Sequence, residues 1–284
     1  MPRVPLICAI LALPWLAAAH VALAAPQSSA PAAGPRALPT RFRFDAGAPL
    51  LAPAGVAADG TVCVGTVDGY IHALAPDGSY RWSYSLHGAI THRPLFVGAL
   101  WYVATSAGRI EAFTRDGALA WAFNAPSPVA SELATDASGL LYFVAADHFL
   151  YGITAHGGVS LRTPFAEAKA GPSGSAGEAV FPLNHAGIAV GAQGQGLRRF
   201  GLATAPAFDF GALDTLRDPA GHLWRVVGGA LAFSASQAAA PDVFTLGGSP
   251  LLAPVWSSVG NYAVLSARSG LIVAVDPPPT RQAR

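Results

Sequence analysis

The stretch GYIHALAPDGSYRWSY, residues 69–84, has the pattern of a short strand, a turn and a second strand that carries a tryptophan. A near copy, GRIEAFTRDGALAWAF, begins at Gly108. Six positions are identical in the two stretches, and the last of them pairs Trp82 with Trp121. The chain therefore contains an internal repeat, and the period of this repeat indicates the fold.

Six copies of the first strand of this stretch occur along the chain, each after a small or turn-forming residue. The copies are GYIHAL at 69, GRIEAF at 108, HFLYGI at 148, GLRRFG at 196, GALAFS at 229 and GLIVAV at 270. Their average spacing of about 40 is typical of one four-stranded blade of a β-propeller. Helical repeats of similar length instead need apolar residues three and four apart.

The composition around the copies is that of strands. Segments such as TVCVGTVDGYIHAL and LLYFVAADHFLYGI are rich in β-branched and aromatic residues. They carry almost no charge, as expected of strands that are buried on both faces between neighbouring blades. Asp-Gly pairs supply turn residues that tolerate a positive φ, which tight hairpins need. These pairs begin at residues 59, 68, 77 and 116.

The two tryptophans fall near the ends of their repeats. An outer strand at this place would hold a large ring between adjacent blades, where burial contributes about 2–3 kcal/mol. We therefore expect Trp82 and Trp121 to belong to the core and not to a platform for a ligand.

The two ends of the domain are expected to meet in one blade. The last repeat ends at GLIVAVDPPPTRQAR and has no outer strand with a tryptophan. The stretch RFRFDAGAPLLAPAGVAADG, from Arg41, aligns one repeat further along with RWSYSLHGAITHRPLFVGAL, from Arg81. Residues 41–46 should therefore supply the missing strand and close the ring, which removes an open sheet edge.

These observations predict an all-β fold, a β-propeller of about six four-stranded blades closed by an N-terminal strand. Residues 166–187 indicate an insertion, and the interval that follows, from 196 to 229, is short for a blade. A distorted ring of seven blades is the alternative.

The start of the chain has the features of an export signal. Residues 1–24 hold one arginine, an apolar stretch and the AxA pattern at Ala22 and Ala24, which predicts cleavage after Ala24. A retained membrane anchor is the alternative. Residues 25–40 are rich in Ala, Pro and Ser and are expected to form a flexible tether before a single domain at 41–284. The mature chain would then be periplasmic or secreted.

Composition excludes some partners. Hydrophobic residues make up 52% and charged residues 12% of the chain, and the net charge is +1 without a basic run, which argues against nucleic acid. After cleavage only Cys63 would remain, because Cys8 lies in the signal, so no disulfide within the chain is possible.

Few residues suggest a chemical site. His87 and His92 are the closest histidine pair, but a zinc site needs a third ligand, and we interpret both as structural or exposed. His72 could face the central channel, although a hydrogen-bonded histidine of the sheet is the preferred interpretation. GAQGQG at 191–196 precedes a strand and lacks the helix that phosphate loops require. Five aspartates recur at turns, which indicates a role in backbone geometry: Asp59, Asp68, Asp77, Asp116 and Asp136.

The pattern GTVDGYIHALAPDGSYRWSY resembles the repeat of proteins built like the pyrroloquinoline quinone (PQQ) dehydrogenases. The resemblance is good over residues 65–84 and 104–123, fair over 142–163 and 266–276, and poor between. It implies a propeller. The dehydrogenases of this family use an eight-bladed ring, a vicinal cysteine pair, calcium and an aspartate base, from which this chain departs. The non-catalytic relatives include a periplasmic propeller that helps to insert outer-membrane barrels, although this chain lacks its lipid-attachment cysteine.

The sequence therefore favours an exported, non-enzymatic propeller that binds a protein or acts as a scaffold in the cell envelope, as a monomer. No catalytic, cofactor-binding or metal-binding residues are assigned, and no cofactor is expected. The alternative is a propeller that binds a small molecule at the mouth of its channel, including a PQQ-dependent oxidoreductase.

Overall fold

The chain divides into two compact units, residues 1–34 and 35–284. The computed structural model describes parts of the second unit only, so the predicted signal peptide and most of the predicted tether lie outside the described residues. For the strands between residues 178 and 200 it describes the backbone alone. The described residues are 39–136, 138–164, 178–182, 188–192, 198–200, 215–234, 241–246 and 249–277.

Within these ranges all helices and strands of the element order are β-strands, and they form six antiparallel sheets. The first three sheets follow one another along the chain. The first contains β2 (Gly55–Val56), β3 (Val62–Gly65), β4 (Tyr70–Leu74) and β5 (Tyr80–Ser85). The second contains β6 (Leu95–Val97), β7 (Leu100–Ala104), β8 (Arg109–Thr114) and β9 (Leu119–Asn124), and the third β10 (Ala134–Thr135), β11 (Leu141–Val144), β12 (Phe149–Ile153) and β13 (Val159–Pro164).

The other three sheets lie in the second half of the chain. The fourth sheet has three described strands, β14 (Glu178–Pro182), β15 (Ile188–Ala192) and β16 (Arg198–Phe200). The fifth contains β17 (Thr215–Arg217), β18 (Leu223–Val227), β19 (Ala230–Ser234) and β20 (Asp242–Phe244). The sixth combines β21 (Val255–Ser257), β22 (Tyr262–Ser266) and β23 (Leu271–Val275) with β1 (Thr40–Asp45). The prediction of an all-β fold is therefore confirmed.

The repeats found in the sequence correspond one to one with these sheets. Each copy of the motif is the third strand, in chain order, of a different sheet: β4, β8, β12, β16, β19 and β23, with β1 left out of the count. Six repeats thus make six sheets. Closure of the ring between the fourth and fifth sheets stays a prediction.

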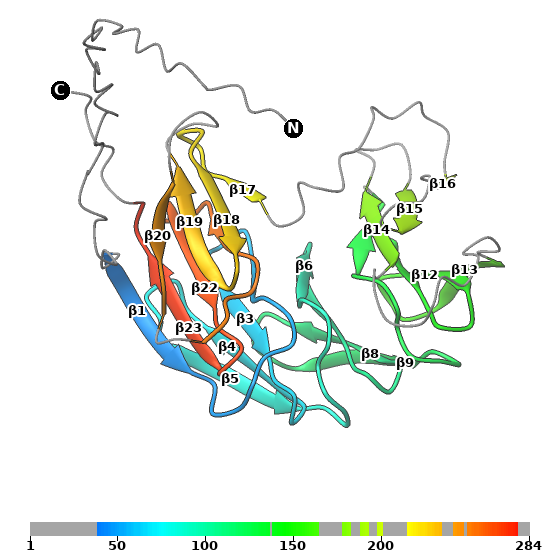
Figure 1. Cartoon of the computed structure of the whole chain (residues 1–284). Helices are drawn as coiled ribbons and strands as arrows, with labels where there is room; N and C mark the ends of the chain where they lie inside the picture. The colour runs from blue at the N-terminus through cyan, green and yellow to red at the C-terminus, as the bar shows by residue number, and fades with distance from the viewer. Residues whose placement is uncertain are drawn as a thin grey trace, which may run out of the picture. The chain divides into compact units, whose positions relative to one another are not determined.

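The strand β1 completes the sixth sheet, as the sequence predicts. It pairs antiparallel with β23, and Phe44 lies opposite Ile272. Figure 1 shows the two strands, from opposite ends of the domain, side by side. The strand spans residues 40–45, one residue earlier at each end than expected, so Thr40 belongs to the sheet.

Hydrophobic clusters join neighbouring sheets face to face. Four clusters each combine buried side chains of two sheets: the sixth with the first, the first with the second, the second with the third, and the fifth with the sixth. The third sheet also contacts the fourth through β10, β11 and β14. Burial on both faces explains why β3 and β11 are buried along their whole length and contain no charge.

The two tryptophans pack between sheets, as predicted. The indole nitrogen of Trp82 donates to the carbonyl of Arg115, and that of Trp121 donates to Ala155, each at 2.7 Å. Both acceptors lie in the hairpin turn of the next sheet. The two rings are half-buried and pack against the clusters between the sheets.

The strand β18 of the fifth sheet differs from β3 and β11 because its central and last residues are exposed. Trp224 on β18 is fully buried in the cluster shared with the sixth sheet. The next residue, Arg225, is exposed, and Val227 is 57% exposed. Alternation of this kind is typical of a strand with one face in the core.

The turns have the backbone conformation that the Asp-Gly pairs predict. Gly69 and Gly108, which precede the third strands of the first two sheets, have φ of 88° and 81°. At the equivalent place before β12 the residue is His148, with φ of 61°. A side chain in this conformation costs about 1 kcal/mol or more.

Candidate functional site

The two histidines of the closest pair, His87 and His92, differ in exposure and in their contacts. His87 is exposed, whereas His92 is half-buried and its Nδ1 lies 3.0 Å from the hydroxyl of Thr91. Burial lowers the pKa of His92 to about 4, so the imidazole is neutral at physiological pH. Within the described ranges no three His, Cys, Asp or Glu side chains gather as metal ligands. The interpretation of the two histidines as structural and exposed fits these positions.

Three of the five turn aspartates bind the backbone of their own turns. Asp59 accepts a hydrogen bond from the amide of Thr61, and Asp77 accepts one from the amide of Ser79, each at 2.9 Å. Asp136 does the same for Ser138. Asp68 accepts from the hydroxyl of Thr66, and Asp116 lies in the turn closed by the bond from Gly117 N to Thr114 O.

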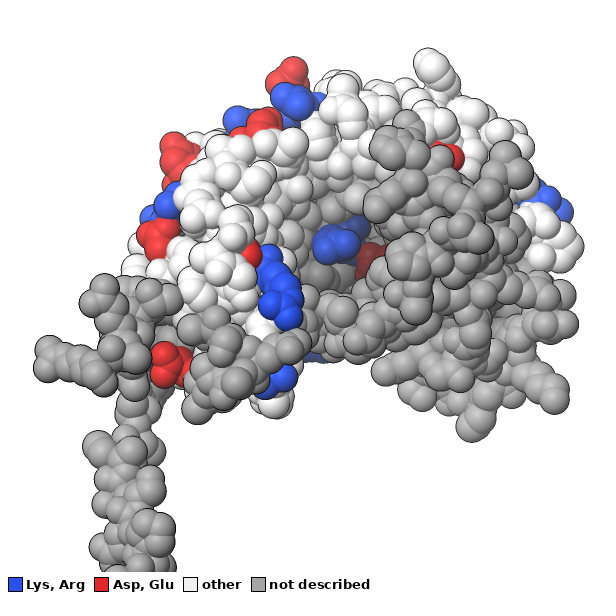
Figure 2. Space-filling view, turned by 90° about the horizontal axis from the view of Figure 1, so that it is seen from above, with Lys and Arg blue, Asp and Glu red and all other residues white. Residues whose placement is uncertain are grey.

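Charged groups also meet near the first strands of the second and third sheets. The amide of Arg93 donates to Oε2 of Glu132 at 3.2 Å, and the two residues occupy equivalent positions before β6 and β10. Burial raises the pKa of Glu132, while the charge of Arg93 partly offsets this effect. On the face drawn in Figure 2, most of the described surface is uncharged, and basic and acidic side chains also occur inside a hollow.

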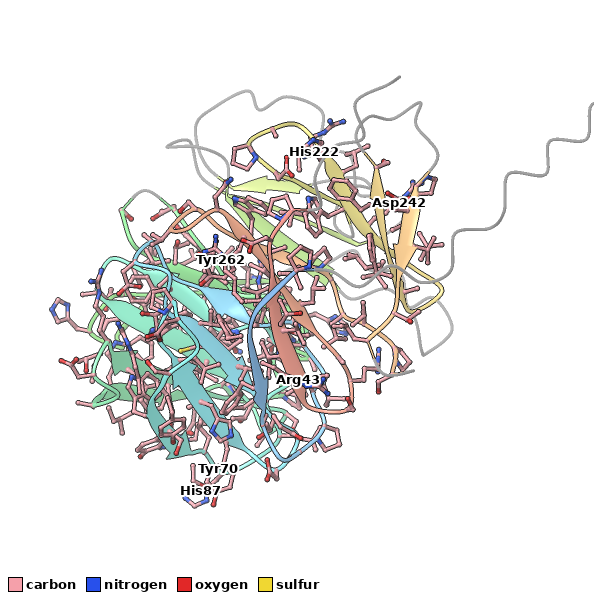
Figure 3. The ribbon with its side chains drawn as sticks, turned by 90° about the vertical axis from the view of Figure 1, so that its left-hand side faces the viewer. Arg43, Tyr70, His87, His222, Asp242 and Tyr262 are labelled. Carbon is pink, nitrogen blue, oxygen red and sulfur yellow. The ribbon has the colours of Figure 1, made fainter. Side chains whose placement is uncertain are left out.

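An aspartate and a histidine are coupled at the loop before β18. Asp218 accepts from Nδ1 of His222 at 2.8 Å and from the indole of Trp224 at 3.1 Å. Burial alone would raise the pKa of Asp218, but these hydrogen bonds outweigh it and lower the pKa. His222 lies at the opposite end of the view in Figure 3 from Tyr70 and His87. Since Asp218 also binds two amides of its own turn, at Ala220 and His222, the arrangement is that of a capped loop.

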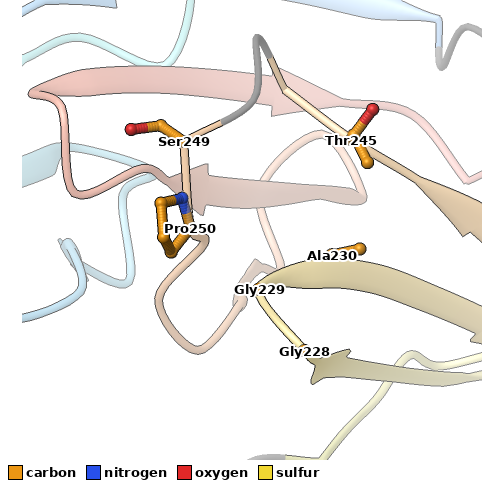
Figure 4. Close-up of a pocket in the computed structure, with 6 residues that line it drawn as sticks. All are labelled: Gly228, Gly229, Ala230, Thr245, Ser249 and Pro250. Atoms are coloured by element: carbon orange, nitrogen blue, oxygen red, sulfur yellow. The ribbon is translucent and has the colours of Figure 1, made fainter.

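A small cavity lies between the turn that joins β18 to β19 and the segment after β20 (Figure 4). Its volume is about 140 Å³, well below the roughly 300–1,000 Å³ of typical ligand sites. None of its described lining residues has an ionisable side chain. The lining residues are Gly228, Gly229, Ala230, Thr245, Ser249 and Pro250.

An exposed aromatic cluster at the joint of the sixth and first sheets is the strongest candidate for a binding surface. We call Phe44, Tyr70, His72 and Tyr80 the aromatic cluster. The rings of Tyr70 and His72 are stacked with centroids 6.1 Å apart, and those of Phe44 and Tyr80 are stacked at 6.4 Å. Tyr70 is 42% exposed and Tyr80 is 54% exposed. Aromatic side chains with a polar tip are enriched in protein interfaces because they offer large rigid area.

The position of His72 corrects part of the sequence interpretation. The residue is on β4, the third strand, and its ring lies 5.8 Å from that of Phe44 on β1, so it faces the neighbouring sheet. Its Nδ1 is buried and has no hydrogen-bond partner among the described residues. The preferred interpretation as a hydrogen-bonded histidine is therefore wrong for this nitrogen. Burial lowers the pKa of His72, although the charge of Asp68 acts in the opposite direction.

The sequence alone did not reveal the aromatic cluster. Tyr70, His72 and Tyr80 lie within the opening repeat, but Phe44 comes from the strand that crosses over from the other end of the domain. The available signal was the alignment of residues 41–46 with the outer strand of the first repeat. That alignment places an aromatic residue beside β4 once β1 is placed in the sixth sheet.

The described part of the chain contains no helix that could cross a membrane. The glycine-rich stretch GAQGQG lies largely outside the described residues, and its first two residues are at the end of β15.

Comparison with known proteins relates the chain to one family model and to solved structures. A family model described as outer membrane protein assembly factor BamB matches residues 28–197, more than half of the chain. Among solved structures, the crystal structure of BamB from Moraxella catarrhalis superposes with a TM-score of 0.50 at 13% sequence identity, over 87% of this chain and 92% of that chain. At this identity the structural likeness bears on the fold alone. Comparison with the curated proteins found no match.

Proposed function

Because the chain belongs to the family described as outer membrane protein assembly factor BamB, we propose that it is an exported, non-enzymatic scaffold that binds a partner protein in the cell envelope. The observation that carries the proposal is the family match over residues 28–197. The mature chain acts in the periplasm or outside the cell, after removal of residues 1–24.

The architecture supports this role. The repeated motif is explained by packing, since its apolar positions lie in the clusters between sheets and its aspartates bind their own turns. The side chains left over for function are those that remain exposed, and the aromatic cluster is a group of this kind joined by ring contacts. A surface of this kind suits contact with another protein.

The test is crosslinking in the native envelope. A photoreactive amino acid replaces Tyr80 in the tagged full-length chain, and crosslinked proteins are identified by mass spectrometry. Val243 on β20, which is 53% exposed, is the matched control position because it has nearly the same exposure on another sheet. We expect one reproducible partner from position 80 and not from position 243, and direct binding of that purified partner.

The absence of any partner from either position would contradict the scaffold role. A rise of the melting temperature with calcium and PQQ would do so as well, because a ligand that binds only the folded state stabilises it by mass action. The second measurement distinguishes the scaffold from a propeller that binds a small molecule.

A further inference from the structure

The guanidinium group of Arg162, on β13, is held on the third sheet by side chains of β12 and of the turn before it. Arg162 lies over the ring of Phe149, with its guanidinium carbon 3.9 Å from the ring centroid. Its Nε donates to the hydroxyl of Tyr151 at 3.1 Å, and its terminal nitrogen lies 3.6 Å from the carboxylate of Asp147. The hydroxyl of Tyr151 in turn donates to Asp147 at 2.6 Å. An aromatic face, a polar tip and a carboxylate thus surround one cation.

The same set recurs two repeats earlier, on the first sheet, without its arginine. Asp68, Tyr70 and His72 stand where the third sheet has Asp147, Phe149 and Tyr151. Arg162 lies directly opposite Tyr151 in the sheet, and the residue directly opposite His72 is Ser83. The first sheet therefore has side chains at all three positions that surround the cation on the third sheet. At the position of the arginine it has the small side chain of Ser83.

The surrounding rings are also equivalent. Phe123 lies 6.4 Å from Tyr151 on the third sheet, and Phe44, at the same position two repeats earlier, lies 5.8 Å from His72. No arginine of the described residues stacks on Tyr70, His72 or Tyr80 or forms an ion pair with Asp68. Asp68 and Tyr70 are exposed, so the set is open to a group from outside.

The second sheet has an arginine at the place of Tyr70, and this arginine is paired with a carboxylate of the same strand. Arg109 occupies the place of Tyr70, and its Nε donates to Glu111, which occupies the place of His72. Glu111 is only 2% exposed, so its charge requires that partner. The second and third sheets thus each hold an arginine of the chain beside this set, although at different positions of the repeat, Arg109 on the third strand and Arg162 on the outer strand. The first sheet has no arginine at either position.

We propose that Asp68, Tyr70 and His72 form a binding site for an arginine side chain supplied by a partner protein. The site supplies a carboxylate for the ion pair, a tyrosine face for the cation and a histidine ring, at the positions whose counterparts on the third sheet hold Arg162. This inference deepens the proposed scaffold function and rests on it only for the source of the arginine.

The direct test is a titration of the purified chain with N-acetyl-arginine methylamide, followed by the NMR signals of the His72 and Tyr70 rings. The citrulline analogue is the matched control probe, because it has nearly the same shape and no charge. We expect saturable shifts with the arginine probe and at least fivefold weaker binding of the citrulline probe. Shifts that do not saturate, or that are equal for both probes, would overturn the proposal.

A substitution inside the chain tests the same site. Ser83→Arg should place a guanidinium on the first sheet as Arg162 is placed on the third, and so abolish the shifts caused by the arginine probe. Ala120→Arg is the matched control, because it adds the same charge on the exposed outer strand of the second sheet. If Ser83→Arg binds the probe as well as the natural chain does, the proposed site is wrong.

The outcome is separable from that of the crosslinking experiment. If the arginine probe binds and no envelope partner is found, the site stands and the scaffold role fails. If a partner crosslinks at position 80 and the probe does not bind, the scaffold role stands and the arginine site fails. A partner whose binding is lost in Ser83→Arg and kept in Ala120→Arg supports both.

Discussion

Phe42 and Trp82 occupy equivalent positions at two successive joints between sheets. Phe42 on β1 packs against the turn at Gly78, and Trp82 on β5 packs against the turn at Gly117. In both cases a ring from the outer strand of one sheet fills the place beside a turn glycine of the next. The joints differ in the origin of the outer strand, because β5 continues directly from β4, whereas β1 reaches the sixth sheet from the other end of the domain.

The end of β1 is held by polar contacts with residues at the other end of the domain. Arg41 forms an ion pair with Asp276 at 2.5 Å and lies over the ring of Tyr262 at 4.9 Å. The amide of Asp276 donates to the carbonyl of Pro39 at 2.9 Å. The equivalent residue of β5, Arg81, also makes polar contacts, with the hydroxyl of Thr61 at 2.8 Å and with Asp59 at 3.9 Å. That strand, however, follows β4 through a short hairpin. A strand supplied from a distant part of the chain has a larger loop-closure entropy, which local bonds must offset.

The largest expected effect is that of removing the distant strand. Deletion of residues 40–45 uncovers the edge of β23 and the side of the first sheet that Phe42 and Phe44 cover. We expect misfolding or aggregation, because an unpaired apolar edge is open to association. Circular dichroism and size-exclusion chromatography provide the measurement. Deletion of residues 27–32 is the control for chain length, and a soluble, equally stable chain lacking 40–45 would refute the role of β1.

Removal of the two rings compares the joints directly. Phe42 is 8% exposed, and we expect Phe42→Ala to lower the free energy of unfolding by about 3–4 kcal/mol. Trp82 is only half-buried, so Trp82→Ala should cost somewhat less, about 2–3 kcal/mol, as should Trp121→Ala. Urea denaturation measures the differences, with Tyr80→Ala as an exposed aromatic control. Unchanged stability of Phe42→Ala or Trp121→Ala would show that the rings are not part of the core.

The turn glycines test the other side of each joint. Gly78 and Gly117 have φ of 86° and 84°, and a Cβ at Gly117 would lie 2.6 Å from the indole of Trp82. Gly98 has φ of 63° and nothing within 4 Å of a Cβ, so Gly98→Ala measures the backbone cost alone, about 1 kcal/mol. We expect Gly78→Ala and Gly117→Ala to cost about 1–2 kcal/mol more than this control. Equal costs for all three variants would mean that the rings can move aside.

The architecture could be predicted from sequence because its signal is periodic. Each third strand follows a turn residue at a spacing of about 40, and the alignment of residues 41–46 with the first outer strand located β1. The exposure of Arg225 and Val227 on β18 of the fifth sheet was not predicted. The feature of the sequence that indicates it is Arg225, a charged residue inside an otherwise apolar run. The repeat period alone does not show which face of the sheet this residue lies on.

The candidate site could not be predicted in the same way. Its residues come from strands on two sheets, and which side of β4 meets β1 depends on how the sheets pack. His72 was recognised as a polar residue inside a buried strand, but its contact with Phe44 required the structure. The absent arginine became visible only when the register of β4 with β5 could be compared with that of β12 with β13.

The smallest expected effect concerns the ion pair at the end of β1. Both Arg41 and Asp276 have side chains that are more than one-third exposed, at 36% and 38%, so solvent screens their attraction. Asp276→Asn should therefore lower the free energy of unfolding by less than about 1 kcal/mol, and the difference should shrink as salt is added. Asp116→Asn, an exposed aspartate in a turn of the second sheet, is the control for the loss of one charge.

The size of this effect distinguishes two accounts of how β1 is held. If the ion pair contributes little, as its exposure indicates, the strand depends mainly on its backbone bonds to β23 and on the burial of Phe42. A loss of more than about 2 kcal/mol in Asp276→Asn, unchanged at high salt, would instead mean that the end of the strand is fixed by a bond that solvent does not screen. In that case the Arg41–Asp276 ion pair would stabilise the joint of the sixth and first sheets more than the burial of Phe42 does.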